Sequence, residues 1–234
     1  MFSVHPQIFL LAVIAATASA ERPSFATSKI ADKEASLKAT LFTFVPKQNR
    51  RFGILDVPKK IPGDNIQKHF DPVEHELMIN GGYFDSDFKP SGYCKIDGKI
   101  INSKVAKNLS GFVAIDNAGK VALLAHDDDF SKYPTVLQSG PYVIDPGGKM
   151  GIRSKSGKRA RRTLIGITTD ERLVILIVDP IYLIDLANAI MKYLPKLERL
   201  LNLDGGPSTA MIGDGQMHVN PAPVRNYLFR AVAH

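Results

Sequence analysis

The stretch TLIGITTDERLVILIVD (residues 163–179) decides the fold class of this chain. Two apolar arms flank the polar segment TTDER, and the second arm is apolar without interruption from Leu173 to Val178. A short continuous apolar strand is typical of the middle of a sheet, where both faces are covered. The stretch therefore predicts a hairpin whose second strand is central in a sheet.

Other segments continue the same pattern. Alternating apolar residues predict hairpins in two segments, with turns at Asp97-Gly98 and at 117–119. Successive hairpins indicate an α+β fold with a large mixed, mainly antiparallel sheet and few packed helices. Hairpins are predicted in 92–102 and 111–125, and further strands in 37–45, 51–57, 75–80, 135–144, 200–203 and 227–233. The strand predicted in 135–144 is broken at Ser139-Gly140-Pro141.

One helix is predicted after the central hairpin. Asp179-Pro180 offers an N-cap followed by a proline at the first helical position. From Ile181 to Leu194 the polar residues fall at spacings of three and four on an otherwise apolar segment. We expect this helix to pack deeply against the sheet.

The first twenty residues predict export. They contain no charged side chain, carry an apolar stretch from Ile8 to Ala16, and end in Ala18-Ser19-Ala20. This is the pattern of a secretory signal peptide. The alternatives are a short amphipathic anchor and a buried strand. No later segment has the roughly 20 apolar residues of a membrane span. We expect a secreted or periplasmic protein cleaved near Ala20 and without stable membrane insertion, with a flexible lead-in at 21–36 and one domain at 37–234.

The cysteine content and the charge distribution restrict the possible kinds of site and partner further. Cys94 is the single cysteine, so no internal disulfide forms, and its apolar surroundings favour a buried small hydrophobic residue. The formal net charge is +7, and six basic residues within 153–162 account for nearly all of the excess. Such a cluster is a solvated loop or a phosphate-recognition element. Interleaved aromatic residues are missing from it, which disfavours nucleic acid as a partner.

Three turns follow apolar strands and share glycines and polar side chains. The third is the strongest candidate for a site, because consecutive glycines leave backbone N–H groups open for an anion and two hydroxyls add donors. An aspartate at the end of a buried strand could act as a base or nucleophile, or could only form the turn through its own backbone. The turns are Asn80-Gly81-Gly82-Tyr83-Phe84-Asp85, Ser139-Gly140-Pro141 and Asp204-Gly205-Gly206-Pro207-Ser208-Thr209.

Other polar clusters carry weaker signals. The segment HDDDF (126–130) lacks the spacing of a calcium loop and is interpreted as a solvated acidic turn. The histidines have no spacing typical of zinc ligands, and no nucleotide-binding or hydrolase elbow motif occurs. The sequence predicts no cofactor and no metal ligand, and it leaves open whether a divalent cation takes part.

Four blocks, taken together, resemble the phosphodiester glycosidase family, the family of the mannose 6-phosphate uncovering enzyme and of exported bacterial proteins. The blocks are MINGGYFDSDFKPSGYCKIDGKIIN (78–102), LQSGPYVI (137–144), RRTLIGIT (161–168) with LVILIVD (173–179), and LNLDGGPSTAM (202–211). They occur in the family's order and span nearly all of the chain from residue 37 onward. Two positions depart from the family pattern: Pro207 replaces a common third glycine, and Tyr83 replaces a common phenylalanine.

The resemblance implies an α+β fold and cleavage of a sugar-1-phosphodiester at the sugar side. It implies Asp204, Asp85 and Arg162 as catalytic residues, with Asp204 preferred over Asp85 as the carboxylate that activates water or stabilises the oxocarbenium-like transition state. Arg162 would hold the phosphate. Substrate binding is implied for Asn80, Gly81, Phe84, Ser139, Gly140, Thr163, Asp179, Gly205, Gly206, Ser208 and Thr209.

Two alternatives remain open at this point. One is a hydrolase of phosphodiester-linked envelope polymers, which a basic surface would attract. The other is a non-catalytic exported module that binds anionic envelope glycans. In each case the expected partner is a sugar phosphodiester or a phosphate-containing glycan.

Overall fold

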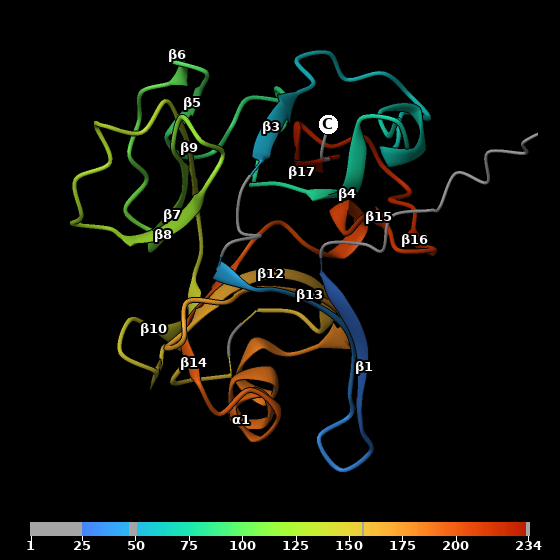
Figure 1. Cartoon of the computed structure of the whole chain (residues 1–234), viewed down its shortest axis with the longest axis vertical. Helices are drawn as coiled ribbons and strands as arrows, with labels where there is room; N and C mark the ends of the chain where they lie inside the picture. Colours follow the sequence, from blue (N-terminus) through green and yellow to red (C-terminus); the bar gives the residue numbers. More distant parts are fainter. Residues whose placement is uncertain (1–24, 47–50, 156, 233–234) are drawn as a thin grey trace, which may run out of the picture.

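A computed structural model describes residues 25–46, 51–155 and 157–232. The predicted signal peptide lies outside these residues. Figure 1 shows one sheet at the bottom with the helix α1 beneath it, and two further sheets side by side above.

Every strand pairing among the described residues is antiparallel, and the strands form three sheets. The first sheet contains, in spatial order, β1 (Ala26–Asp32), β2 (Leu37–Phe44), β13 (Leu173–Ile181), β12 (Ala160–Thr168), β14 (Leu197–Asn202), β10 (Tyr142–Asp145) and β11 (Lys149–Met150). The second contains β16 (Gln216–His218), β15 (Met211–Gly213), β4 (His75–Asn80), β17 (Asn226–Ala231) and β3 (Phe52–Asp56). The third contains β6 (Lys99–Asn102), β5 (Cys94–Ile96), β9 (Thr135–Ser139), β7 (Gly111–Ile115) and β8 (Val121–Ala125).

The predicted strands and hairpins are confirmed, whereas the single large mixed sheet is wrong. The alternation of apolar and polar residues within a segment predicts that the segment is a strand and which of its faces is buried. It does not report which distant strand pairs with it, and that pairing divides the strands among three sheets. The break predicted at 139–141 has a clear role, because β9 ends there in the third sheet and β10 begins in the first.

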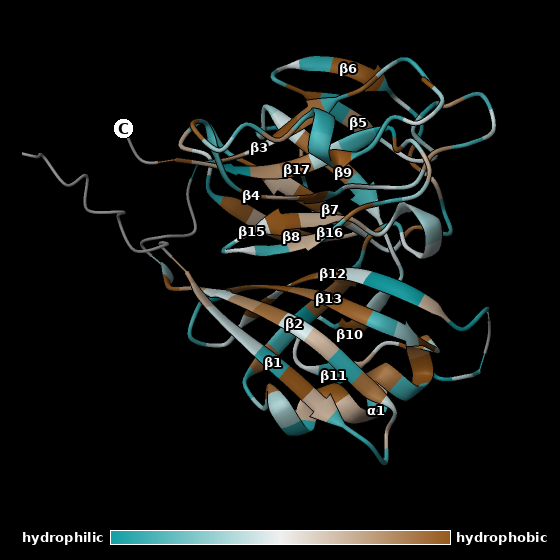
Figure 2. Ribbon diagram, turned by 90° about the vertical axis from the view of Figure 1, so that its right-hand side faces the viewer, coloured by the Kyte–Doolittle hydropathy of each residue, from teal (hydrophilic) through white to brown (hydrophobic). Residues whose placement is uncertain are grey.

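The central position predicted for the second arm of the hairpin is confirmed. β13 lies between β2 and β12, with Leu176 opposite Leu41 on one side and Leu164 on the other. Its side chains alternate between two hydrophobic clusters. Ile175 and Ile177 face the second and third sheets, whereas Val174, Leu176 and Val178 face the side covered by α1. Figure 2 shows this first sheet as a layer below the other two.

The helix α1 spans Leu183–Tyr193 and buries one face against the first sheet. The predicted N-cap at Asp179-Pro180 is wrong, because both residues belong to the end of β13 and Tyr182 is the N-cap residue. Proline is tolerated at a strand end, where its missing N–H breaks few ladder bonds. A short 3-10 turn, η2 (Ile66–Lys68), lies in the loop before β4 and contacts β4 and β15 of the second sheet. No helix among the described residues is long and apolar enough to span a membrane.

The flexible lead-in predicted for 21–36 is wrong where it overlaps β1. This strand pairs with β2 over seven residue pairs, from Ala26 opposite Thr43 to Asp32 opposite Leu37. It is an edge strand, and Ile30 is its one buried residue. Its polar sequence therefore reflects the exposure of an edge rather than an absence of structure.

One hydrophobic cluster joins all three sheets. Phe42 comes from the first sheet, Leu228 from the second, and Val113 and Leu137 from the third. Cys94 belongs to the same cluster and is fully buried, as predicted. Its burial raises the pKa of the thiol to about 12, so the group stays a protonated, unreactive side chain.

Candidate active site

Asn80 ties the second sheet to the first at the end of β4. It is fully buried, and its side chain is bonded at both ends. The carboxamide oxygen accepts from Thr163 Oγ1 at 2.6 Å and from the amide of Ala210 at 3.0 Å, while Nδ2 donates to the carbonyl of Asp204 at 2.8 Å. Asn80, Thr163 and Asp204 come from three of the blocks that the resemblance singled out, and this network brings them together.

The second block joins the same place from the third sheet. Ser139, the last residue of β9, is fully buried and donates from Oγ to the carbonyl of Asn202 at 2.9 Å. The next residue, Gly140, has a φ of 156°. A Cβ on Gly140 would lie 2.6 Å from the amide nitrogen of Ser110, so only glycine fits this crossing between sheets.

Two asparagines that sequence reasoning missed complete the framework. Asn202, at the end of β14, donates from Nδ2 to the hydroxyl of Tyr83 and to the carbonyl of Leu203. Asn226, at the start of β17, accepts from the amide of Gly82 at 2.8 Å through its side chain. A signal for Asn202 was present, since it is a lone amide within the otherwise apolar LLNL.

Asp204 follows β14 and begins the glycine-rich turn. Its carboxylate is half-buried and accepts from the amide of Gly205 at 2.7 Å and from the side chain of Ser208. Burial raises the pKa of this carboxyl, although the two hydrogen bonds partly oppose that effect. A carboxylate with this property accepts a proton more readily than that of an ordinary aspartate.

The turn itself offers fewer backbone donors than its glycines suggested. Residues Gly206–Ser208 form the 3-10 turn η3, in which the amides of Ser208 and Thr209 donate to the carbonyls of Gly205 and Gly206. The amide of Gly205 is held by the Asp204 carboxylate, and Pro207 has no N–H. The turn therefore orients Asp204, and the amide of Gly206 is its one backbone donor without a hydrogen-bond partner among the described residues.

Asp204 and Arg162 are both electrostatic neighbours of Tyr83. Burial raises the pKa of the Tyr83 phenol, the Asp204 carboxylate raises it further, and Arg162 opposes this effect. The phenol therefore stays protonated, and because its oxygen accepts from Asn202, its own proton is available to a ligand. Arg162 is half-buried, which lowers its pKa, and its guanidinium donates to the carbonyls of Lys158 and Ile181.

Three of the predicted site residues lie apart from this network. Phe84 packs in a hydrophobic cluster with its ring 5.0 Å from that of Phe88. Asp85 is exposed, and its carboxylate accepts from the amide of Lys89 at 2.9 Å, so it forms a turn. Asp179 is exposed at the end of β13 and lies with His218 in a groove between the first and second sheets.

The described residues contain no group of three or more histidine, cysteine, aspartate or glutamate side chains placed to hold a metal ion. In the segment HDDDF, Asp128 accepts from the amide of Ala125 at 2.7 Å and so closes a turn.

Comparisons with known proteins agree with this architecture. A sequence model of the phosphodiester glycosidase family matches residues 74–234. No protein of curated function shows a significant sequence match.

Three solved structures share the fold. The catalytic domain of zebrafish N-acetylglucosamine-1-phosphodiester alpha-N-acetylglucosaminidase, auto-inhibited by its pro-peptide, has a TM-score of 0.65 at 16% identity, covering 92% of this chain and 85% of that one. A hypothetical protein from Synechocystis has a TM-score of 0.65 at 12% identity, with coverages of 89% and 62%. A candidate exported protein from Burkholderia pseudomallei has a TM-score of 0.60 at 12% identity, with coverages of 85% and 75%. Because the family match spans more than half of the sequence, the chain belongs to the phosphodiester glycosidase family.

Proposed function

We propose that this protein is an exported hydrolase that cleaves the glycosidic bond of a sugar-1-phosphodiester and releases a reducing sugar and a phosphomonoester. Membership of the phosphodiester glycosidase family supports the reaction class. The zebrafish protein of similar fold is an enzyme that acts on an N-acetylglucosamine-1-phosphodiester, which supports a sugar at the cleaved bond. N-terminal sequencing of the exported protein tests the localisation, with Glu21 expected as the first residue.

The observation that carries this proposal is the setting of Asp204. Its carboxyl is half-buried with a raised pKa, it is oriented by Gly205 and Ser208, and it lies close enough to Tyr83 to raise the pKa of that phenol. A carboxylate that is held in one orientation and partly removed from water is suited to take a proton from the water molecule that attacks the sugar C1. Neighbouring O–H and guanidinium donors suit the oxygen atoms of a phosphodiester.

The proposed reaction needs one water molecule and no other reagent. The bond between the sugar C1 and the bridging oxygen breaks, and its electron pair stays on the phosphate oxygen. Water forms the new bond to C1 and gives a proton to the Asp204 carboxylate, or to bulk solvent where Asp204 instead stabilises the positive charge that develops on the sugar. The leaving phosphomonoester has a second pKa near 6, so it departs with little protonation.

The active site must then mainly stabilise the negative charge on the departing phosphate. In this proposal Arg162 supplies the positive charge and Tyr83 adds a neutral O–H donor. The hydrogen bonds from Arg162 to Lys158 and Ile181 fix its position before a substrate arrives, which reduces the ordering that binding requires.

The test is an assay of reducing-sugar release from a panel of sugar-1-phosphodiesters, with and without divalent cations. We expect the Asp204→Asn variant to lose about 1000-fold in kcat, the scale of a general acid or base. Asp85→Asn tests the second carboxylate. Asp214→Asn is the matched control, because Asp214 is an exposed turn residue with a φ of 49° that asparagine also adopts.

Each outcome separates the proposed function from its alternatives. Full turnover by a folded Asp204→Asn variant contradicts the role given to Asp204. Release of a sugar phosphate instead of a reducing sugar means cleavage of the P–O bond and contradicts the reaction class. Salt-sensitive binding of anionic glycans without turnover of any phosphodiester favours the non-catalytic module.

A further inference from the structure

Arg162 and Asn202 lie on the same face of the first sheet. Arg162 pairs with Val178, which belongs to the hydrophobic cluster on the α1 side. Asn202 pairs with Leu164 of the same cluster. Side chains of directly paired residues project from the same face of a sheet. The guanidinium and the carboxamide are therefore both on the α1 side, at the end of the sheet where Asp204 follows β14.

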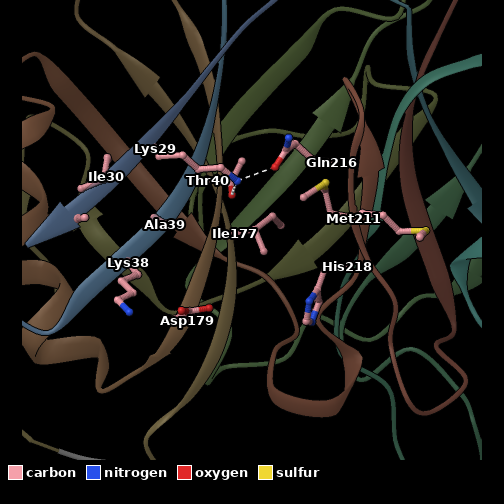
Figure 3. A pocket seen from close by; sticks show the side chains of 12 residues that line it. Lys29, Ile30, Lys38, Ala39, Thr40, Ile177, Asp179, Met211, Gln216 and His218 are labelled. Atoms are coloured by element: carbon pink, nitrogen blue, oxygen red, sulfur yellow. Dashed lines mark hydrogen bonds between the residues drawn. The ribbon is translucent and has the colours of Figure 1, made fainter.

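The groove in Figure 3 opens on the opposite face, between the first and second sheets. Ile30 belongs to the α1-side cluster, so its neighbour Lys29 projects toward the second sheet. There Lys29 Nζ donates to Thr40 Oγ1 at 2.7 Å and to Gln216 Oε1 at 2.6 Å, which ties the two sheets together. This ammonium group thus has partners of its own on the face opposite to Arg162.

The backbone of Asn202 is held on both sides by the crossing between the third and first sheets. Its amide donates to the carbonyl of Pro141 at 3.1 Å, and its carbonyl accepts from Ser139 Oγ at 2.9 Å. The residue is fully buried, so its side chain has no access to solvent. The carboxamide is therefore fixed in place before any ligand binds.

The carbonyl of Leu203 determines which end of this carboxamide faces Tyr83. A carbonyl oxygen accepts and does not donate, so the Asn202 atom that lies 2.8 Å from it is the amino group Nδ2. The same Nδ2 contacts the hydroxyl of Tyr83, and its two hydrogens are then both in use. The phenol oxygen is therefore the acceptor in that contact, and its own hydrogen points elsewhere.

The other end of the carboxamide shows that packing does not explain an amide at this position. Asn202 Oδ1 is buried and has no hydrogen-bond partner among the described residues. A buried acceptor without a partner destabilises the folded state, and an apolar side chain of similar shape would avoid this cost. The other three residues of LLNL (200–203) are leucines, so the strand itself accommodates such a side chain. The contacts of Nδ2 are what distinguish Asn202 from its neighbours.

The hydroxyl of Tyr83 has a free hydrogen beside the charged groups of the candidate site. Tyr83 is half-buried, and its hydroxyl makes one hydrogen bond among the described residues, the one that it accepts from Asn202. Asp204 and Arg162 both act electrostatically on this phenol. Phosphate oxygens are acceptors, and a free O–H near a guanidinium group is placed to meet one of them.

We propose that Asn202 is a positioning residue that fixes the Tyr83 hydroxyl as a hydrogen-bond donor to the departing phosphate. This inference rests on the proposed function, in which Arg162 holds that phosphate. Arg162 and Tyr83 then present donors only, so this end of the site selects a group whose oxygens are all acceptors, as in an ionised phosphodiester. A phenol turned the other way would place an oxygen lone pair against the phosphate.

Asn202→Asp reverses this one hydrogen bond at nearly constant shape. At pH 5 a carboxyl that is buried and faces the carbonyl of Leu203 keeps its proton, donates it to that carbonyl, and accepts from Tyr83. The experiment compares wild type, Asn202→Asp, Tyr83→Phe and the double variant at pH 5. Calorimetry measures the affinity for inorganic phosphate, and reducing-sugar release measures kcat. Asn117→Asp is the matched control, because Asn117 is an exposed residue of the turn between β7 and β8.

We expect phosphate affinity and kcat to fall about tenfold in Tyr83→Phe, the scale of one neutral hydrogen bond, and at least as far in Asn202→Asp. In the Tyr83→Phe background, Asn202→Asp should change both quantities by less than about twofold, because the hydroxyl through which it acts is gone. The control should change neither. A role of Asn202 that is only structural would lower both quantities in either background and would overturn the proposal.

Phosphate binding keeps this proposal separate from the proposed function, because it needs no turnover. Losses of phosphate affinity that depend on each other support the positioning role even if no phosphodiester is cleaved. Wild-type affinity in Tyr83→Phe overturns it, and this comparison does not depend on whether Asn202→Asp folds. If Asn202→Asp does not fold, Asn202→Leu takes its place in both backgrounds, since leucine removes the contact with Tyr83 without adding a charge. A loss of affinity with Asn202→Leu that is equal in the two backgrounds also contradicts the proposal.

Discussion

Thr163 Oγ1 donates to Asn80 Oδ1 across 2.6 Å and thereby joins the middle of the first sheet to the end of β4 in the second. Both residues are fully buried, and Asn80 uses its other side-chain atom to hold the carbonyl of Asp204. The carboxylate proposed to act on the sugar is therefore positioned through a contact between two sheets.

Removal of this contact should affect both stability and turnover. We expect Thr163→Val to lower the free energy of unfolding by about 1–2 kcal/mol, because one buried hydrogen bond is lost while Ala210 still donates to Asn80. Denaturant unfolding measures this change. Thr43→Val is the control, since Thr43 lies on β2 with no side-chain hydrogen bond among the described residues. Equal effects of the two substitutions would mean that the Thr163 contact contributes nothing specific.

The raised pKa of Asp204 predicts a pH-dependent penalty on stability. The folded protein holds the proton of this carboxyl to a higher pH than the unfolded chain does. Its contribution therefore lowers the free energy of unfolding as pH rises from about 4, the ordinary value for aspartate, through the raised folded pKa. Asp204→Asn should be more stable than wild type at pH 7, with the difference shrinking toward pH 4. A series of unfolding curves across this range measures it, and a constant difference would contradict the assignment.

The same carboxyl predicts the acid side of the activity profile. If Asp204 acts as a carboxylate, kcat/KM should rise with pH, with a midpoint above the ordinary pKa of aspartate. An assay in buffers of constant ionic strength measures the profile. A midpoint at or below the ordinary value would show that another group controls the reaction.

Tyr83→Phe separates the role of the hydroxyl from that of the ring. Loss of the Tyr83 hydroxyl removes one acceptor for Asn202 Nδ2, but Nδ2 keeps its hydrogen bond to the carbonyl of Leu203. We therefore expect the free energy of unfolding to fall by about 1 kcal/mol. If the O–H donates to a substrate oxygen, kcat should fall about tenfold, which corresponds to one neutral hydrogen bond. The family commonly has phenylalanine here, so a loss as large as that of Asp204→Asn would contradict an auxiliary role.

Gly205→Ala tests the close approach of the turn to β12. A Cβ at this position would lie 2.6 Å from the backbone oxygen of Arg161, so the turn that carries Asp204 must shift. We expect a stability cost of about 1–3 kcal/mol and a fall of about 100-fold in kcat/KM, because small displacements of a catalytic group are costly. Pro207→Ala is the control, since Pro207 is exposed, and it should change both quantities little.

The sequence predicts the strands well because burial on one face leaves an alternating pattern in each segment. It fails where the deciding information is not local. The polar strand β1 resembles a flexible segment because it lies at an edge, and Asp179-Pro180 resembles a helix start although pairing with β12 extends the strand to Ile181.

In the candidate site, too, the sequence predicts the local features and misses the contacts between distant segments. Asp204 and the glycines are recognisable as a motif, and the resemblance brings the other blocks to them. The side chains of Asn202 and Asn226 contact Tyr83 and Gly82, residues that are far from them in the sequence and meet them only after β14 and β17 have packed beside the end of β4. Nothing in their sequence neighbourhood states which turn they hold. The resemblance also could not report that Ser208 and Thr209 use their amides within η3.

The strand β17 lies between β3 and β4, although it is the last of the described strands in the chain, and it brings Asn226 to the Gly81-Gly82 turn. A polypeptide that has emerged from the ribosome only as far as β16 holds every proposed catalytic group but lacks the strand that fixes their frame. The proposed hydrolytic activity should therefore require β17, and a chain that ends after β16 should lack it.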